Sequence, residues 1–313
     1  MMKIMPAVRE QVVLEGTLPG ELQEMLQNVS EYGNPMGESP RKRVRWTKDL
    51  EQPPRDLSKE DGSELVEVLW YVSDYYAYHG RGNDAARALT RVFNRLEVDF
   101  GILGTLEKCD GDSQRLVGET GLFEELAQHN DEQFQKYKHG TLVVTDPHAF
   151  NAFKNHYPKV TGNEYRVAHY TQYLSNRLKE LKPLLVKPYE KKLTFHDPCY
   201  LGRHNGEYQA PRDLVVAIPG AEFMEMYRCR EQSYCCGGGG GGMWLDGVSA
   251  DHTRERLSEN RVREAVEIGA EVLVVCCPYE VSRFEDAVKS TDNEGKLEVR
   301  DIAEILDYCM DGV

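Results

Sequence analysis

Short apolar runs alternate with amphipathic helical stretches from about residue 64 to the end of the chain. Short runs rich in Val, Leu and aromatic residues predict strands, and longer stretches with apolar residues at every third or fourth position predict helices. Because strand-like and helical segments alternate, the pattern favours an α/β fold with mainly parallel sheets. The predicted strands are 65–73, 98–103, 140–145, 191–196, 221–226 and 271–275, and the clearest helices are 84–96, 122–137 and 254–269.

The second half of this pattern repeats the first. In each half a strand leads to a landmark residue, a Cys-Asp-Gly or Cys-Cys-Gly segment follows, and a later strand ends at Asp-Pro or Cys-Pro. Matched landmarks at nearly constant spacing imply an internal duplication. We expect two Rossmann-like α/β domains, residues 61–187 and 188–313, related by a pseudo-twofold axis and facing each other. The matched pairs are Asp74 and Cys199, Asp110 and Cys236, and Asp146 and Cys277, at offsets of 125, 126 and 131 residues.

Residues 1–60 read as an extension rather than a domain. Two short helical patterns are followed by turn and charge signals, among them Tyr32-Gly33-Asn34-Pro35 and Pro40-Arg41-Lys42-Arg43. Such signals suit a segment that packs on another surface or docks a partner. A partly disordered tail is the alternative.

Composition narrows the class of protein. The 313 residues are 40% hydrophobic and 29% charged, which describes a soluble globular chain long enough for two domains. No stretch approaches the ~18–20 apolar residues of a membrane span, and the first residues lack the pattern of a signal peptide, so we expect a cytoplasmic location. The net charge of −14 argues against a nucleic-acid partner.

Eight cysteines are present, and four of them form the adjacent pairs Cys235-Cys236 and Cys276-Cys277. Neighbouring cysteines rarely form a disulfide with each other, because the geometry strains the peptide. The chain is also large enough to build a core without cross-links. Metal ligation in a reducing compartment is therefore favoured over disulfides.

The second half contains a set of cysteines whose spacing suits metal ligation. Cys199 is followed after 35 residues by Cys235-Cys236-Gly, and after 40 more by Cys277-Pro-Tyr-Glu280. Each cysteine is expected at a strand-to-helix junction, and these junctions gather along one edge of a parallel sheet. Thiolates suit soft metals and iron–sulfur clusters. A structural zinc is the alternative, although zinc sites usually show two CxxC knuckles that this spacing lacks.

A glycine run at 237–242 follows the second cysteine segment. Without Cβ atoms, the backbone of Gly237, Gly238 and Gly239 can approach a cluster closely and point N–H groups at sulfur. Such hydrogen bonds would stabilise the negative charge of the cluster. A flexible linker is the alternative interpretation.

These residues resemble the cysteine-rich CCG-domain family. The segments that carry the resemblance are HDPCYLGRHNGEYQAPRDLVVAIPG at 196–220, CCGGGGGGMW at 235–244 and CPYEVSRFEDAVK at 277–289. The likeness covers about 64–313, and the segment YGNPMGESPRKRVRW resembles the family's linker after a two-cluster ferredoxin domain. The family includes heterodisulfide reductase subunits of the B/D type and the iron–sulfur subunits of glycolate and lactate dehydrogenases.

The chain departs from the family pattern in both halves. In the second, Glu280 stands where the family has a fifth cysteine of an unusual non-cubane 4Fe–4S cluster. Four cysteines remain, enough for a cubane, and either Glu280 or Cys276 could complete the set; Cys276 could equally be an apolar strand residue. In the first half the motif is degenerate, so no cluster is expected there. The residues standing at its ligand positions are Asp74, Cys109, Asp110, Asp146 and Ala149.

Two side chains beside the cysteines are candidates for catalysis. Glu280 could offer a hard oxygen ligand. His196 precedes Asp-Pro-Cys and could donate a hydrogen bond to a cluster sulfide or relay a proton, with a buried structural histidine as the alternative. His148, in the degenerate motif, could line the space between the halves.

The resemblance implies an oxidoreductase subunit of a heterodisulfide-reductase-like complex, acting on a small disulfide or thiol at a cysteine-ligated 4Fe–4S cluster. It also implies a ferredoxin-like iron–sulfur subunit and a flavoprotein subunit as partners. The alternatives are an electron-relay subunit of a flavin-dependent 2-hydroxy-acid dehydrogenase and a zinc-stabilised assembly module.

Overall fold

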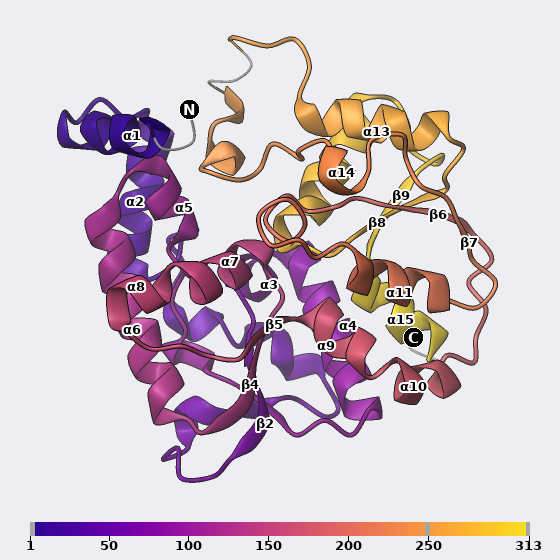
Figure 1. The fold of residues 1–313 in the computed structure, drawn as a ribbon, viewed down its shortest axis with the longest axis horizontal. Helices are drawn as coiled ribbons and strands as arrows, with labels where there is room; N and C mark the ends of the chain where they lie inside the picture. Colours follow the sequence, from indigo (N-terminus) through magenta and orange to yellow (C-terminus); the bar gives the residue numbers. More distant parts are fainter. Residues whose placement is uncertain (1–3, 248–250, 311–313) are drawn as a thin grey trace.

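The computed structural model describes residues 4–247 and 251–310 (Figure 1). Two parallel sheets organise the chain. The first sheet, in the order β1-β3-β2-β4-β5, lies in the lower left of Figure 1, and the second, in the order β7-β6-β8-β9, lies in the upper right. We call these sheets with their helices the first half and the second half. This architecture confirms the predicted α/β fold with parallel sheets.

The two sheets share one topology. In the first half β2 pairs with β3 and β4, and β4 pairs with β5; in the second half β6 pairs with β7 and β8, and β8 pairs with β9. The order β3-β2-β4-β5 therefore matches β7-β6-β8-β9 strand for strand, as a duplication requires. The strands are β1 (Arg55–Asp56), β2 (Val66–Tyr71), β3 (Phe100–Ile102), β4 (His139–Val144), β5 (Val167–His169), β6 (Lys192–Phe195), β7 (Glu222–Phe223), β8 (Val272–Val275) and β9 (Glu298–Asp301).

Helices connect the strands in both halves. The first half contains α3 (Asp74–Tyr78), α4 (Gly80–Arg95), α5 (Asp112–Val117), α6 (Thr120–Lys136), α7 (Pro147–Asn155), α8 (Tyr157–Thr161), α9 (Tyr170–Asn176) and α10 (Leu178–Leu181), with the 3-10 turns η3 (Leu57–Lys59), η4 (Gly104–Leu106) and η5 (Lys182–Leu184). The second half contains α11 (Gln209–Ala217), α13 (Leu257–Glu267), α14 (Pro278–Ser290) and α15 (Ile302–Cys309), with the turns η6 (Arg230–Gln232) and η7 (Gly242–Trp244).

The N-terminal segment packs on both halves. It holds α1 (Ile4–Leu14), α2 (Gly20–Tyr32), η1 (Pro40–Lys42) and η2 (Arg45–Asp49). A small apolar cluster includes Leu22 and Met25 of α2, Val117 of α5, and Trp244 of η7. Further along, β1 adds a strand to the edge of the first sheet beside β3. The extension therefore forms part of the fold rather than a loose tail.

A continuous interface joins the halves through α4 and α15. Arg81 of α4 donates hydrogen bonds to Glu285 of α14 at 2.7 Å and to Glu304 of α15 at 2.7 and 2.8 Å. The hydroxyl groups of Tyr76 and Tyr170 donate to Asp301 at the end of β9. One apolar cluster includes core residues from both sheets. The halves are thus held together by buried apolar side chains as well as by ion pairs and hydrogen bonds.

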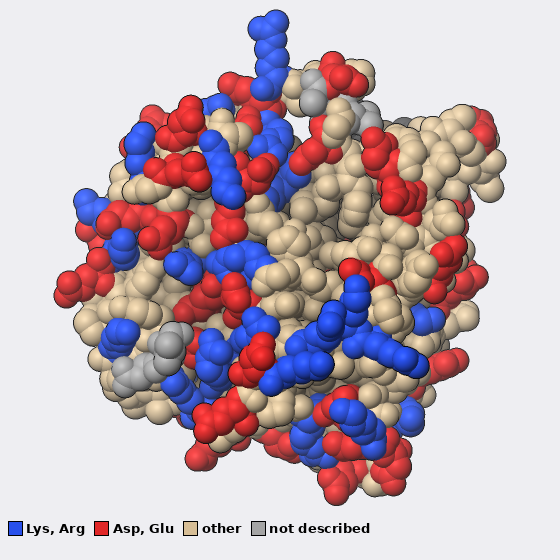
Figure 2. All heavy atoms as spheres, turned by 180° about the vertical axis from the view of Figure 1, so that it is seen from behind, with Lys and Arg blue, Asp and Glu red and all other residues tan. Residues whose placement is uncertain are grey.

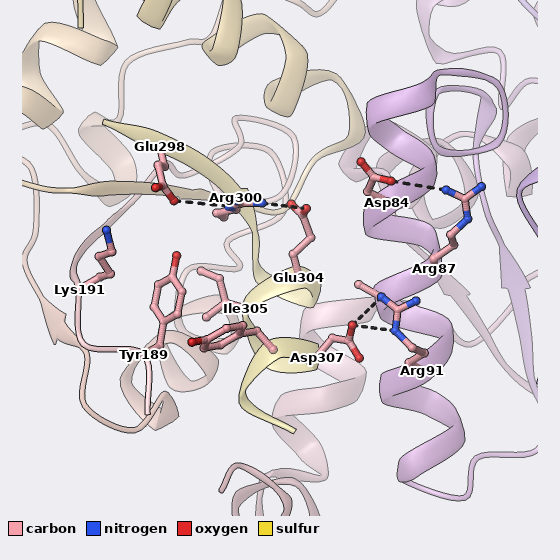
Figure 3. A pocket seen from close by; sticks show the side chains of 12 residues that line it. Asp84, Arg87, Arg91, Tyr189, Lys191, Glu298, Arg300, Glu304, Ile305 and Asp307 are labelled. Atoms are coloured by element: carbon pink, nitrogen blue, oxygen red, sulfur yellow. Dashed lines mark hydrogen bonds and ion pairs between the residues drawn. The ribbon is translucent and has the colours of Figure 1, made fainter. Parts of the chain in front are cut away.

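A cavity of about 560 Å³ opens beside this interface, between α4, β9 and α15 (Figure 3). Several of its charged side chains are paired with one another: Arg91 lies 2.6 Å from Asp307, and Arg300 lies 3.6 Å from Glu298 and 3.7 Å from Glu304. None of its described lining residues is a cysteine. The cavity therefore lies apart from the predicted metal ligands.

Charges of both signs are interspersed on the face shown in Figure 2. Among the helices that the structure describes, none combines the length and apolar character needed to cross a membrane.

Candidate metal centre

The four cysteines of the second-half constellation gather at the carboxyl edge of the second sheet. β7, β6 and β8 are parallel neighbours, so the segments that leave them emerge at the same edge. Cys199 lies in the turn after β6, and Cys277 is the N-cap of α14, two residues beyond β8. Cys235 and Cys236 follow β7 and η6. Cys199 and Cys277 therefore lie where a strand leads towards a helix, whereas Cys235 and Cys236 lie in the loop after η6.

Cys235 is central to this group. The neighbouring thiols of Cys199 and Cys236 and the hydrogen bond from the N–H of Gly237 lower the pKa of the Cys235 thiol despite burial. The pKa values of Cys199 and Cys236 are raised, first by their interaction with Cys235 and then by desolvation. Sulfur donors are the ligands that soft metals prefer.

Cys277 completes the set on the buried side. It is 3% exposed, and burial together with the charge of Glu280 raises the pKa of its thiol. Cys199 and Cys235, by contrast, keep part of their surface open. The group therefore has a buried side and a side that a partner molecule can approach.

The glycine run supplies backbone donors to two of the sulfurs. The N–H of Gly237 donates to Sγ of Cys235 at 3.3 Å, and the N–H of Gly238 donates to Sγ of Cys236 at 3.4 Å. Gly237 adopts φ +82°, in the left-handed region where a side chain causes strain. A Cβ on Gly239 would lie 2.9 Å from the ring of His148. The run is therefore a shaped part of the site, not a free linker.

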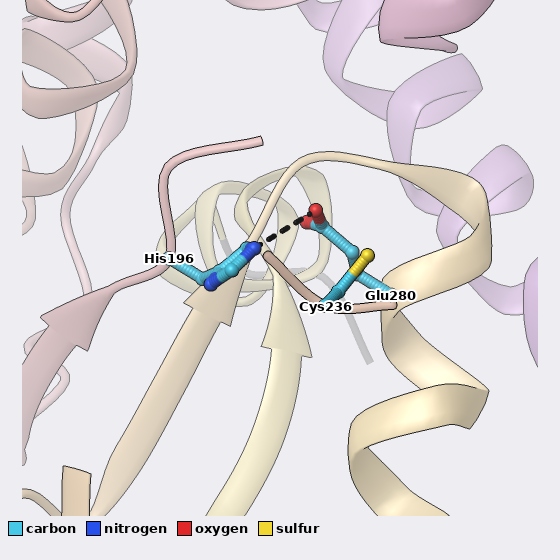
Figure 4. Close-up of side chains that lie close together, drawn as sticks. All are labelled: His196, Cys236 and Glu280. Carbon is cyan, nitrogen blue, oxygen red and sulfur yellow. Dashed lines mark ion pairs between the residues drawn. The ribbon is translucent and has the colours of Figure 1, made fainter. Parts of the chain in front are cut away.

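His196 and Glu280 meet beside Cys236 (Figure 4). Each offers one ligand atom, and the three atoms lie within 4.8 Å of one another. His196 Nε2 lies 3.3 Å from Oε1 of Glu280. Burial raises the pKa of the Glu280 carboxyl well above its usual range, and the charge of Cys235 adds to the shift. Within the part of the chain that the structure describes, neither His196 Nε2 nor Glu280 Oε2 has a hydrogen-bond partner, and both residues are 1% exposed.

Arg261 of α13 contacts His196 from the opposite side. Its Nε donates to Nδ1 of His196 at 3.1 Å, and the guanidinium is fully buried. Desolvation and then the charge of Arg261 lower the pKa of His196 well below its usual range. The imidazole is therefore neutral.

The remaining cysteines lie elsewhere. Cys276 is fully buried in the large apolar cluster, whereas Cys277 contacts Tyr75 and Tyr279 in a different cluster. Adjacent residues leaving a strand point to opposite faces, so this placement favours the alternative in which Cys276 is a core residue. Cys309 is in the same apolar cluster as Cys276. All eight cysteines are free thiols, in agreement with the preference for metal ligation over disulfides.

In the first half, other contacts occupy the equivalent positions. The guanidinium of Arg43, from the N-terminal segment, forms an ion pair with Asp74 and lies 2.7 Å from Glu107. Asp110 accepts the backbone N–H of Asp112 at 2.7 Å. Within the described residues of this half, no three potential ligand atoms lie as close together as those of His196, Cys236 and Glu280. The expectation that the first half holds no cluster stays a prediction.

His148 of the first half lies against the cysteine segments. Its Nδ1 is 2.7 Å from Asp112, and its ring centroid is 4.1 Å from that of Tyr200 and 6.0 Å from that of Tyr279. Tyr200 follows Cys199, Tyr279 is two residues beyond Cys277, and Gly239 also contacts His148. The expectation that His148 lines the space between the halves agrees with these contacts.

Comparison with known proteins identifies the scaffold. The cysteine-rich domain named CCG matches the chain twice, over residues 70–154 and 193–279. The chain belongs to this CCG family. The two matches cover the two halves, so the resemblance and the duplication inferred from the sequence are confirmed.

Several relatives of this CCG-family chain are named as oxidoreductases or as a subunit of a reductase. It is 36% identical over 97% of its length to the probable iron-sulfur-binding oxidoreductase FadF of Bacillus subtilis, and 36% identical over 99% to the EtfAB:quinone oxidoreductase of Syntrophomonas wolfei. It spans only 43% of either relative. It is 32% identical over 97% of its length to one subunit of the dihydromethanophenazine:CoB–CoM heterodisulfide reductase of Methanosarcina barkeri, and it spans 72% of that relative.

Sequence reasoning missed two residues of this region. Arg261 was not singled out, although its position on α13 beside the buried Ser258, Val262 and Ala265 places it on the inward face of an amphipathic helix. Arg43 stood in a segment recognised for its turn and charge signals and its resemblance to the family's linker, and no role was assigned to its side chain. Its pairing with Asp74 depends on tertiary structure that the local pattern does not contain.

Proposed function

We propose that this chain is an iron–sulfur electron-transfer subunit of an oxidoreductase, with a 4Fe–4S cluster held by Cys199, Cys235, Cys236 and Cys277. The observation that carries the proposal is the pair of backbone N–H groups already directed at the sulfurs of Cys235 and Cys236, at the sheet edge where Cys199 and Cys277 also lie. The names of the relatives support the redox class.

The residues present fit such a group. Soft sulfur donors dominate the set, and backbone hydrogen bonds to sulfur are a usual way to stabilise the charge of a cluster. Oε2 of Glu280 is buried without a partner beside Cys236, a cost that a metal ligand would remove. When bound, the cluster would supply one-electron transfer. The choice between a cubane and a non-cubane geometry follows from whether Glu280 is a ligand.

For the substrate, we propose a small disulfide or thiol that approaches the side of Cys199 and Cys235. Those two cysteines keep exposed surface, while Cys236 and Cys277 are buried. The similarity to one subunit of a heterodisulfide reductase supports this assignment. In this role the chain positions the substrate sulfur, and the glycine loop and His148 form part of the wall around it.

A relay role is the second candidate. The two 36% identical relatives have the names of an iron-sulfur-binding oxidoreductase and of an EtfAB:quinone oxidoreductase, and the first half lacks a second thiol set among its described residues. The chain would then pass electrons between a flavoprotein and a ferredoxin-like partner subunit. The N-terminal segment offers a surface for such a partner.

The decisive experiment is anaerobic quantification of iron and sulfide, followed by a redox titration monitored by electron paramagnetic resonance. We expect about four irons and four sulfides for each wild-type chain, as a 4Fe–4S cluster requires. Cys236→Ala should lose the cluster, whereas the control Cys229→Ala should keep it. Zinc as the only metal, or a cluster that survives in Cys236→Ala, would disprove the proposal. A spectrum that changes on adding a small thiol favours catalysis over relay.

A further inference from the structure

A buried row of three side chains crosses the second half behind the cysteines. Nε of Arg261 donates to Nδ1 of His196 at 3.1 Å, and Nε2 of His196 faces Oε1 of Glu280 at 3.3 Å. All three residues are at most 1% exposed. The row runs from helix α13 through the end of β6 to the first turn of α14.

The contact with Arg261 decides which nitrogen of His196 carries the proton. The Nε of a guanidinium always carries hydrogen and can only donate. Nδ1 of His196 must therefore accept, with its lone pair directed at Arg261. A neutral imidazole has one proton, so that proton is on Nε2, the nitrogen facing Glu280 and Cys236.

This tautomer excludes one role for His196 and assigns another. A protonated Nε2 has no lone pair for a metal, so His196 is a donor at the site and not a ligand. Oε1 of Glu280 lies 3.3 Å from this nitrogen without the alignment of a hydrogen bond, so neither Nε2 nor Oε2 has a partner among the described residues. When a carboxylate turns to accept such an N–H through one oxygen, it presents the other oxygen in a fixed direction, as in many metal sites.

We propose that Arg261 is a positioning residue that fixes His196 as the Nε2–H tautomer, so that His196 orients Glu280 as the oxygen ligand of the metal centre. The inference rests on the proposed function, because it names the role of the residue standing in place of the fifth cysteine.

The surroundings hold this row in place. Nη1 of Arg261 donates to the carbonyl of Arg228 at 2.6 Å and to Glu264 at 2.7 Å, so the buried guanidinium has a compensating carboxylate. The ring of Phe284 packs edge-on against His196 with 4.8 Å between centroids. An arginine costs free energy to bury even when paired, and here its Nε is committed to a histidine rather than to a second carboxylate.

The first test is the tautomer of His196 in the full iron-free chain. NMR of histidine labelled with ¹⁵N distinguishes a protonated Nε2 from a protonated Nδ1. We expect Nε2–H in the wild type and a population of Nδ1–H in Arg261→Met. The control Arg263→Met removes an exposed arginine from the same helix and should match the wild type. Nδ1–H in the wild type, or an unchanged tautomer in Arg261→Met, would overturn the inference.

The second test uses the reconstituted chain. The hyperfine coupling of histidine ¹⁵N should be weak in the wild type, because no nitrogen is bound to the metal. Glu280→Gln and Arg261→Met should both change the midpoint potential, and Arg263→Met should leave it unchanged. A strong coupling from a directly bound nitrogen would refute the assignment.

The two tests separate this inference from the proposed function. If Arg261→Met does not fold, the wild-type tautomer and coupling still decide the matter. If the chain assembles no cluster, the proposed function fails while the tautomer measurement still reports on Arg261 and His196.

Discussion

Gly237 has two roles, one in the backbone conformation of the loop and one as a hydrogen-bond donor to sulfur. Its φ of +82° is the left-handed conformation, and its N–H donates to Cys235. We expect Gly237→Ala to cost about 1 kcal/mol of folding free energy and to weaken the hydrogen bond to sulfur. The measurement is the midpoint potential and the cluster content after reconstitution.

Gly269 provides a matched control for this prediction. It has φ +77° and open space around a would-be Cβ, and it lies just beyond α13, away from the sulfurs. Gly269→Ala should cost a similar free energy of unfolding, ~1 kcal/mol, without any effect on the cluster. Equal changes of the midpoint potential in both variants would contradict the special role of Gly237.

The ion pair of His148 and Asp112 predicts a pH dependence. Burial alone would lower the pKa of His148, but the hydrogen bond and charge of Asp112, with Asp146 and Asp110, outweigh it and raise the pKa from 6.5 to about 9. A group whose pKa is raised by folding stabilises the folded state when the pH is below the pKa that the group has in the unfolded chain. That stabilisation, of the order of 3 kcal/mol at most, is lost as the pH rises through about 9.

We expect the difference in free energy of unfolding between the wild type and His148→Gln to shrink between pH 6.5 and 9. Denaturant titrations of the iron-free chain at several pH values measure this difference. His139→Gln serves as the control, since burial lowers the pKa of His139 and its difference should stay flat in that range. A flat profile for His148→Gln would show that the ion pair is not formed.

The cysteines of the candidate site could be predicted from the sequence, but not every side chain around them could. Cys199, Cys235, Cys236 and Cys277 follow predicted strands, and the rule for parallel sheets brings such positions together. Arg261 could not be found that way, because an arginine on a charged helix is usually exposed. Only the packing of α13 on β6 places its guanidinium beside His196.

At the scale of elements, the longer strands and helices were predictable and the short ones were not. β2, β4 and β8 contain continuous apolar stretches, and their burial follows from that pattern. β5 has three residues, and β9 alternates exposed Glu298 and Arg300 with buried Val299 and Asp301. β1 is two residues long and exists only because β3 offers an edge.

The N-terminal segment is anchored to the first half by Arg43. Its guanidinium, 3% exposed, lies between Asp74 and Glu107. Arg43→Met would leave two buried carboxylates without their cation, so we expect a loss of ~3–5 kcal/mol in free energy of unfolding. The measurement is denaturant unfolding combined with hydrogen exchange of residues 40–49.

The neighbouring Arg45 is the control, because its side chain is exposed. Arg45→Met should change the free energy of unfolding by no more than ~0.5 kcal/mol. If Arg43→Met is as stable as Arg45→Met, the ion pair does not anchor the segment.

At the scale of the whole molecule, Arg81 joins the two halves. It reaches from α4 to Glu285 and Glu304 of the second half and is 18% exposed at its side chain. We expect Arg81→Met to lower the free energy of unfolding by ~1–3 kcal/mol and to increase hydrogen exchange in α4, α14 and α15 together. Native-state exchange measures both effects.

Arg87, on the same helix, pairs with Asp49 of the N-terminal segment and with Asp84 of α4, both at 3.5 Å. Arg87→Met should therefore leave exchange in α14 and α15 unchanged. Exchange that rises equally in the second half of both variants would show that Arg81 has no special part in joining the halves.

The contact between the N-terminal helices and the glycine run has a consequence for when the site can close during translation. A Cβ on Gly241 would lie 2.8 Å from Leu22, a residue 219 positions earlier (241 − 22). Closing so long a loop is slow compared with local folding, and α2 emerges from the ribosome well before its partner. The thiol site therefore acquires this wall only after the segment around residue 241 has been translated, which leaves the cysteines before it open to loading until then.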